Sequence, residues 1–151
     1  MALYTGNDNN IIGDLLSPYP LDTGSGTVEL RFVGGLLGQF AVWTKRAVEL
    51  LDSAKRATAG DNAALRDLMR IDGPFTDANA ALFDVANNFH GCIAGINHIL
   101  ALQGLLAGRW CLDPQEDLSS GQAAEIDRVT RSYPYLTDDA FVAEHLDAWL
   151  R

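Results

Sequence analysis

Only two segments of this chain have the apolar, strand-like composition that a sheet requires, and this limits the folds open to it. The first is residues 2–4 (ALY), which end in the polar turn TGND, and the second is about residues 29–37. A parallel pair of strands does not make a stable sheet alone, because parallel sheets need several strands with both faces covered. The chain is therefore either a helical domain with an unusual N-terminal hairpin or the end of a larger α/β protein, and the pattern slightly favours the second.

Helical patterns occupy most of the chain after the second strand. The clearest lies at about 43–57, where Trp43 and Leu50 share an apolar face and charged residues occupy the other face. Gly73-Pro74 is expected to break the chain, and the breaker-rich residues 17–26 predict an exposed loop. The expected helices are about 9–16, 43–57, 62–70, 78–88, 92–106, 120–131 and 138–150, with caps at Asp8 or Asn9, Asp61 or Asn62, Thr76 or Asp77, and Thr137.

The charge and the cysteines indicate the compartment and the partners. With 11 basic and 20 acidic residues the net charge is −9, which disfavours nucleic acid and acidic membrane surfaces as partners. The N-terminal MALYTGND lacks the basic region of a signal peptide, and no apolar run reaches the ~18 residues of a membrane span. Cys92 and Cys111 form no CxxC and are interpreted as reduced thiols. We therefore expect a cytoplasmic protein without a metal or cofactor.

Four segments, in this order and spacing, resemble the dihydrodipicolinate synthase and N-acetylneuraminate lyase family. TGND at 5–8 resembles the turn after strand seven of that family, and FVGGLLGQFAV at 32–42 resembles its glycine-containing eighth strand. NAALRDLMR at 62–70 resembles the helix that follows a Gly-Asp turn, and His90–Asp127 resembles the C-terminal helices. The chain looks like the C-terminal part of a divergent, uncharacterised branch of the family.

The resemblance implies an α/β fold, the C-terminal portion of a (β/α)8 TIM barrel. Residues 1–58 would hold the last two β/α units, and residues 59–151 would form a helical region packed on the barrel. The family forms a Schiff base between a lysine on strand six and a 2-oxo acid such as pyruvate, and a tyrosine on strand five relays protons. Both strands would lie upstream of residue 1. Because the imine is the electron sink for making or breaking the C–C bond, we expect the chain to be inactive alone.

The turn after the first strand holds the first group of candidate substrate-binding residues. Gly6, Asp8 and Asn9 would lie at the C-terminal face of a barrel, where active-site loops gather. The resemblance implies that they contact substrate hydroxyls. The alternative is a polar turn followed by a helix cap, which Asp and Asn commonly supply.

The end of the second strand holds the second group, which is Leu37, Gly38 and Gln39. The resemblance implies that Leu37 and Gly38 face the bound 2-oxo acid. Loops after strands seven and eight also bind phosphate in such barrels, although a GGxxG run alone is weak evidence for it. A third interpretation is close packing of the backbone at Gly34 and Gly35 inside the barrel.

No other side chain forms a recognisable catalytic set. Lys45 and Lys55 have the spacing of a solvated helix face, whereas a Schiff-base lysine needs desolvation or a cationic neighbour. His90 and Cys92 are two ligands at most, too few for a metal site. Gly24-Ser25-Gly26 is a loop rather than a nucleophile elbow. The remaining histidines and tryptophans are interpreted as packing or interface residues: His98, His145, Trp43, Trp110 and Trp149.

Two further hypotheses stand beside a lyase fragment. The chain can be a non-catalytic binding or assembly module, a half-barrel that another chain or a second copy completes, because an open strand edge and exposed apolar faces drive association. It can also be a truncated gene product without function. The partners expected from the first two are a small 2-oxo acid in the complete enzyme and either an upstream barrel half or a homo-oligomer.

Overall fold

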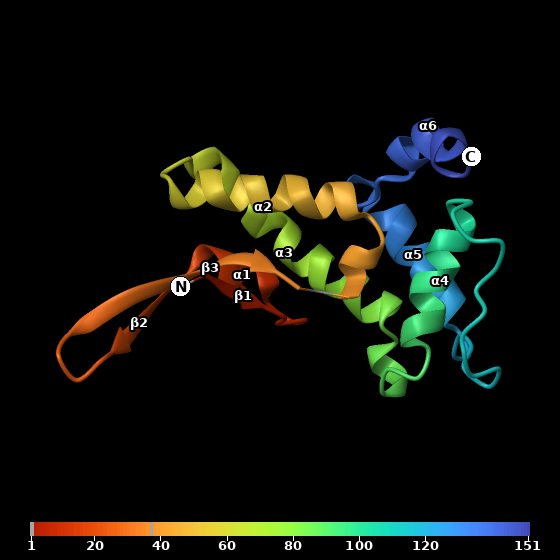
Figure 1. The fold of residues 1–151 in the computed structure, drawn as a ribbon, viewed down its shortest axis with the longest axis horizontal. Coiled ribbons are helices and arrows are strands. Elements are labelled where there is room, and N and C mark those ends of the chain that lie inside the picture. The colour runs from red at the N-terminus through yellow and green to blue at the C-terminus, as the bar shows by residue number, and fades with distance from the viewer. Residues whose placement is uncertain (1, 37) are drawn as a thin grey trace. The chain divides into compact units, whose positions relative to one another are not determined.

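The computed structural model describes residues 2–36 and 38–151, and it is an α/β structure, as expected. Within these residues it contains six α-helices and one small mixed sheet of three strands (Figure 1). No described helix is both long enough and apolar enough to cross a membrane. The elements are β1 (Leu3–Thr5), α1 (Ile11–Leu16), β2 (Pro18–Asp22), β3 (Thr27–Gly35), η1 (Gly38–Ala41), α2 (Thr44–Thr58), α3 (Asn62–Leu82), η2 (Val85–Asn87), α4 (Cys92–Leu102), α5 (Gln122–Ser132), η3 (Pro134–Leu136) and α6 (Asp139–Trp149).

The chain divides into two compact units. Unit 1 comprises Met1–Leu37 and Ala47–Thr76, and unit 2 comprises Gly38–Arg46 and Asp77–Arg151. Unit 1 holds the sheet, α1 and most of α2, whereas unit 2 holds α4, α5 and α6. The division at residue 58, which the resemblance implies, concerns barrel membership and stays a prediction.

The sheet of unit 1 joins a parallel pair to an antiparallel pair. β3 is the central strand, with β1 parallel to it on one side and β2 antiparallel on the other. Tyr4 is the register partner of Gly34, and a Cβ added at Gly34 would lie 2.5 Å from Cε1 of the Tyr4 ring. This glycine therefore makes room for an aromatic ring, which agrees with the packing interpretation of Gly34.

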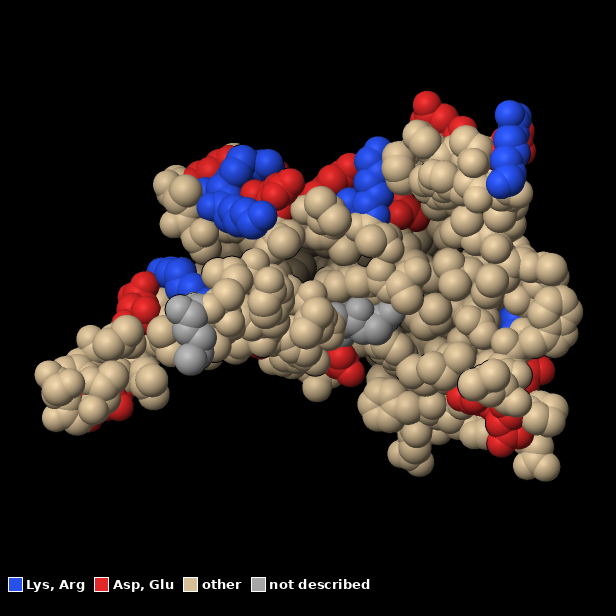
Figure 2. Space-filling view, viewed as in Figure 1, with Lys and Arg blue, Asp and Glu red and all other residues tan. Residues whose placement is uncertain are grey.

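The expected loop at 17–26 is wrong, because β2 and a tight turn occupy it. The strand was not predicted because it contains Pro18 and Pro20. Both prolines are tolerated because β2 is an edge strand. The Tyr19 ring meets the Phe32 ring edge-on, with 5.0 Å between the centroids. Figure 1 shows the β2–β3 hairpin as a long two-stranded ribbon. Figure 2 shows mostly uncharged side chains toward its tip and both acidic and basic side chains nearer its base.

The expected break at Gly73-Pro74 is also wrong, because α3 continues through it. A proline inside a helix removes one backbone hydrogen bond and costs about 3 kcal/mol. Buried side chains follow Pro74 directly along the helix, including Phe75, Ala78 and Leu82. Each large apolar side chain buried contributes on the order of 1.5–3 kcal/mol, so this burial offsets the lost hydrogen bond.

One of the expected caps is confirmed. Asp61 Oδ1 accepts the backbone N–H groups of Ala63 and Ala64, both at 3.0 Å, and the bond from Ala64 is the main reason that the pKa of Asp61 lies below its usual value. The other caps are wrong. The N-cap of α1 is Asn10, that of α6 is Asp138, and Thr76 and Asp77 lie inside α3.

The helices of unit 2 enclose an apolar core. Gly95 is essential to this packing, because a Cβ there would lie 2.1 Å from the carbonyl oxygen of Leu82 at the end of α3. α4 can approach that end of α3 only with a glycine at this position. The expected helices at 92–106, 120–131 and 138–150 correspond to α4, α5 and α6, of which α4 ends four residues earlier. The core side chains include Ala94, Ile99, Ile126, Val129, Leu136 and Val142.

Candidate functional site

The predicted turn after β1 lies where the carboxyl ends of β1 and β3 meet. The backbone N–H of Leu36 donates to the Thr5 carbonyl at 2.8 Å. A Cβ added at Gly6 would lie 3.4 Å from the Leu36 carbonyl oxygen. The end of the second strand and the turn after the first strand are therefore neighbours at one edge of the sheet.

The turn itself is ordered by short-range hydrogen bonds. The N–H of Asn7 donates to Thr5 Oγ1 at 3.2 Å, and the N–H of Asn9 donates to Asn7 Oδ1 at 3.1 Å. The Asn9 carbonyl accepts from Thr76 Oγ1 at 3.2 Å, which fastens the turn to α3. Asp8 is half-buried and Asn9 is exposed. The turn thus presents Gly6 and Asn9 to solvent on a fixed backbone.

A carboxylate behind this turn was missed by the sequence analysis. Asp14 Oδ2 accepts from Thr5 Oγ1 at 2.5 Å, and Asp14 Oδ1 accepts from the Tyr19 hydroxyl at 2.8 Å. The bond to Asp14 is the main reason that the pKa of Tyr19 lies above its usual value. Tyr19 therefore donates its proton to Asp14 and does not act as a base near neutral pH. No sequence motif predicts the contacts of Asp14 with Thr5 and Tyr19. The strand that carries Tyr19, β2, was itself not predicted.

The second predicted group, at the end of β3, is only partly covered by the structure. Leu37 lies outside the described residues, and Gly38 begins η1 in unit 2. The Gln39 side chain is only 2% exposed, and its Oε1 has no hydrogen-bond partner among the described residues. Gly6, Asp8 and Asn9 belong to unit 1, whereas Gly38 and Gln39 belong to unit 2. The two predicted groups are therefore two separate sets of residues, one in each unit.

The two lysines remain on an exposed helix surface. The Lys55 ammonium pairs with Asp52 at 3.3 Å, and its side chain is mostly exposed. The Lys45 ammonium lies 4.4 Å from the centre of the Phe141 ring in unit 2. Figure 2 shows basic and acidic side chains interspersed over α2. Neither lysine lies in the desolvated pocket that a Schiff-base amine requires.

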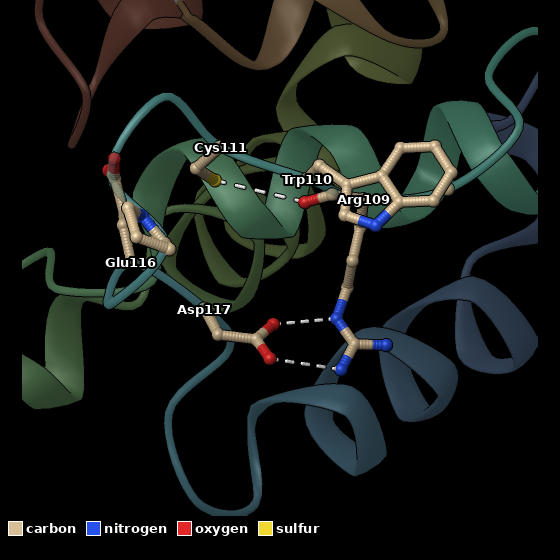
Figure 3. A pocket seen from close by; sticks show the side chains of 7 residues that line it. Arg109, Trp110, Cys111, Glu116 and Asp117 are labelled. Atoms are coloured by element: carbon tan, nitrogen blue, oxygen red, sulfur yellow. Dashed lines mark hydrogen bonds and ion pairs between the residues drawn. The ribbon is translucent and has the colours of Figure 1, made fainter.

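A second candidate region is the loop between α4 and α5 (Figure 3). Arg109 donates two hydrogen bonds to Asp117, from Nε at 2.6 Å and from Nη2 at 3.2 Å. This bidentate pair lowers the pKa of Asp117 to about 2. The pair lines a cavity of about 450 Å³, next to which the Trp110 side chain is 76% exposed.

The thiol of this region is poorly suited to nucleophilic catalysis. Burial, followed by the charges of Glu116 and Asp117, raises the pKa of Cys111, so the thiol stays protonated at neutral pH. Burial and then Arg109 lower the pKa of His98. In the part of the chain that the structure describes, no three metal-ligating side chains are grouped around a common point. Cys92 and Cys111 are both half-buried.

Comparisons with protein-family models, with curated proteins and with solved structures found no match to this chain. The geometry of the described residues is therefore what bears on function.

Proposed function

We propose that the chain supplies the last two β/α units and the helical extension of a (β/α)8 barrel lyase that forms Schiff bases with 2-oxo acids. The observation that carries this proposal is the parallel pairing of β1 and β3, with α1 between them in sequence and α2 after them. Barrel enzymes are built from such units and place their sites at the carboxyl ends of the strands. Gly6 and the Leu36 carbonyl meet at that end.

β2 departs from an all-parallel barrel, and the proposal has to accommodate it. β2 pairs with residues 27–31 of β3, whereas β1 pairs with residues from 32 to 35. The carboxyl half of β3 thus keeps the parallel arrangement, and the hairpin occupies only its amino half. The site edge is the carboxyl half.

In the proposed role this chain binds and orients the substrate and does not form the imine. Gly6, Asp8 and Asn9 of unit 1 would line the substrate side, and the amine would come from a lysine on another strand. Lys45 and Lys55 do not supply it, because both are on the solvated surface of α2.

Ligand-observed NMR tests the binding part of this proposal. Saturation transfer from the chain to the methyl group of pyruvate is expected, and Gly6→Val should weaken it by adding bulk beside the Leu36 carbonyl. Gly73→Ala is a control in the same unit, because outside its own helix a Cβ at Gly73 meets nothing within 4 Å. Absence of transfer to pyruvate, or equal transfer with Gly6→Val, would reject the binding site.

Reductive trapping tests the catalytic part. Borohydride added with pyruvate should leave the intact mass of the chain unchanged, because neither lysine is desolvated. A pyruvate adduct on Lys45 or Lys55 would show that this chain forms the imine itself.

A second candidate function is an assembly module, and the sheet of unit 1 favours it. Several large apolar side chains of the sheet are about half exposed or more. An exposed apolar surface of this kind favours association with another chain. Leu36, next to the proposed site, is 71% exposed. The others are Tyr4, Leu21, Val28 and Val33.

A further inference from the structure

Trp43 combines three unusual features in unit 2. Its backbone is left-handed, with a φ of 54°, which is rare for a bulky residue and costs on the order of 1–3 kcal/mol. Its side chain is 4% exposed, and its indole Nε1 has no hydrogen-bond partner among the described residues. Such strain persists only where the surrounding structure imposes it, and it is concentrated at binding sites.

Trp43 is one of the residues that line a cavity of about 250 Å³. Most of the lining is hydrocarbon, from Ile99, Leu102 and Ala143 as well as the indole. This volume is below the roughly 300–1,000 Å³ typical of pockets for drug-sized ligands, so the cavity suits a smaller molecule. The remaining lining residues are Gln103, Thr130 and Asp139.

The polar groups of this cavity are acceptors. Gln103 Nε2 donates to Asp138 Oδ1 at 3.0 Å and to Asp139 Oδ1 at 2.8 Å, which uses both amide hydrogens and leaves Oε1 as an acceptor. The Thr130 hydroxyl donates to the Ile126 carbonyl at 2.8 Å, so the lone pairs of Thr130 Oγ1 can still accept a hydrogen bond. Trp43 Nε1 is buried and adds no exposed donor to this set.

Two carboxylates stand beside the cavity, and only one of them can serve a ligand. Asp138 is buried and accepts the Lys45 backbone N–H at 3.1 Å in addition to the Gln103 amide. Asp139 is exposed at the mouth, and among the described residues Gln103 is its hydrogen-bond partner. Asp139 Oδ2 is therefore available to a donor that enters the cavity.

We propose that this cavity binds a small organic ammonium ion, with its apolar body among Trp43, Ile99 and Leu102 and its ammonium group on Asp139. An ammonium group brings three donors to a site that offers acceptors, and its charge is attracted by the carboxylate. An indole face also attracts cations. A carboxylate ligand would face repulsion from Asp139. This site lies within unit 2, and the proposal does not depend on the lyase proposal.

Three ligands of the same skeleton test the charge preference: phenethylamine, 2-phenylethanol and 3-phenylpropionate. The chain with Trp110→Phe and Trp149→Phe retains Trp43 as its fluorophore, and calorimetry on the unaltered chain gives a second readout. Phenethylamine should bind saturably, and the alcohol and the carboxylate should bind at least about ten-fold more weakly, as expected for a charge-assisted bond. No saturable binding of phenethylamine by either method, or equal binding of the carboxylate, would overturn the proposal.

Variants on α6 locate the site. Asp139→Asn should weaken phenethylamine binding about ten-fold and leave the alcohol unchanged. Asp147→Asn is the matched control, because Asp147 is an exposed acid on the same helix outside the cavity lining. Ala143→Leu should fill the cavity and abolish binding of phenethylamine while circular dichroism keeps its native form. Equal weakening by Asp139→Asn and Asp147→Asn, or full binding by Ala143→Leu, would place the ligand elsewhere and reject the site.

Discussion

The guanidinium of Arg128 on α5 donates two parallel hydrogen bonds to the Asp77 carboxylate on α3, each 2.9 Å long. The Tyr133 hydroxyl donates a third, to Asp77 Oδ2 at 2.8 Å. These bonds connect residues 51 and 56 positions apart in sequence. The hydrogen bonds from Arg128 are the main reason that the pKa of Asp77 lies below its usual value, although partial burial opposes them.

Asp77→Asn should therefore lower the free energy of unfolding by about 1 kcal/mol at neutral pH, a modest value because both partners are more than one-third exposed. The pKa is lower in the folded state, so the carboxylate stabilises the fold above its unfolded pKa, near 3.8. This contribution is lost as the pH falls through the folded pKa. Urea unfolding at several pH values measures the difference between the two proteins.

Arg131→Met is the control for this pair, because Arg131 pairs with Asp127 one turn away on the same helix and is more exposed. It should change stability by less than about 0.5 kcal/mol. A difference between Asp77→Asn and the natural chain that persists unchanged in acid would contradict the role of the charge.

Two helical glycines should differ in their response to alanine. Gly95→Ala places a Cβ 2.1 Å from the Leu82 carbonyl and should cost about 1–3 kcal/mol, because backbone has to move. Gly73→Ala meets nothing within 4 Å outside its own helix and chain neighbours, but Gly73 directly precedes Pro74, whose ring disfavours a Cβ on the preceding helical residue. It should therefore change stability by less than about 1 kcal/mol. Thermal unfolding by circular dichroism compares the two, and a stabilised Gly95→Ala would mean that α4 does not approach α3 as described.

Asp84 should be the most sensitive carboxylate of unit 2. It is 3% exposed and left-handed, with a φ of 58°, and it accepts from Ser119 Oγ at 2.6 Å, from Asn87 Nδ2 at 2.7 Å and from the Gly91 N–H at 2.9 Å. Burial acts to raise the pKa of Asp84, but these hydrogen bonds outweigh it and the pKa is lowered.

Asp84→Ala should cost about 2–4 kcal/mol, because it leaves the buried Gly91 N–H without an acceptor and places alanine in a left-handed backbone. Asp84→Asn should cost less, since Asn tolerates that backbone and keeps one acceptor. Chemical denaturation ranks the two variants. Equal stability of Asp84→Ala and the natural chain would show that the network does not hold the turn before α4.

Local patterns predicted much of the fold, and long-range contacts account for what they missed. The amphipathic face of α2 and the Asp61 cap were readable because helix periodicity and capping are local. β2 was missed because its two prolines are acceptable only at an edge, and a sequence does not say which strand is at the edge. The continuity of α3 through Pro74 depends on burial by residues distant in sequence.

The candidate sites show the same limit. The meeting of Gly6 with the end of β3 followed from parallel pairing, because the carboxyl ends of parallel strands share an edge. No sequence motif predicted the hydrogen bonds that Asp14 accepts from Thr5 and Tyr19. Trp43 was interpreted as a packing or interface residue and is buried, but its left-handed backbone and its buried N–H without a partner among the described residues are visible only in three dimensions.

The native mass of the purified chain, measured by light scattering with thermal unfolding alongside, tests most directly whether it is part of a barrel. The exposed apolar side chains of β1 and β3 have no cover within unit 1 among the described residues. We therefore expect a dimer or larger species, or a loosely folded chain whose unfolding becomes cooperative when an upstream barrel half is added. A monomer with a single sharp unfolding transition would contradict it, because such a chain would be a self-sufficient domain.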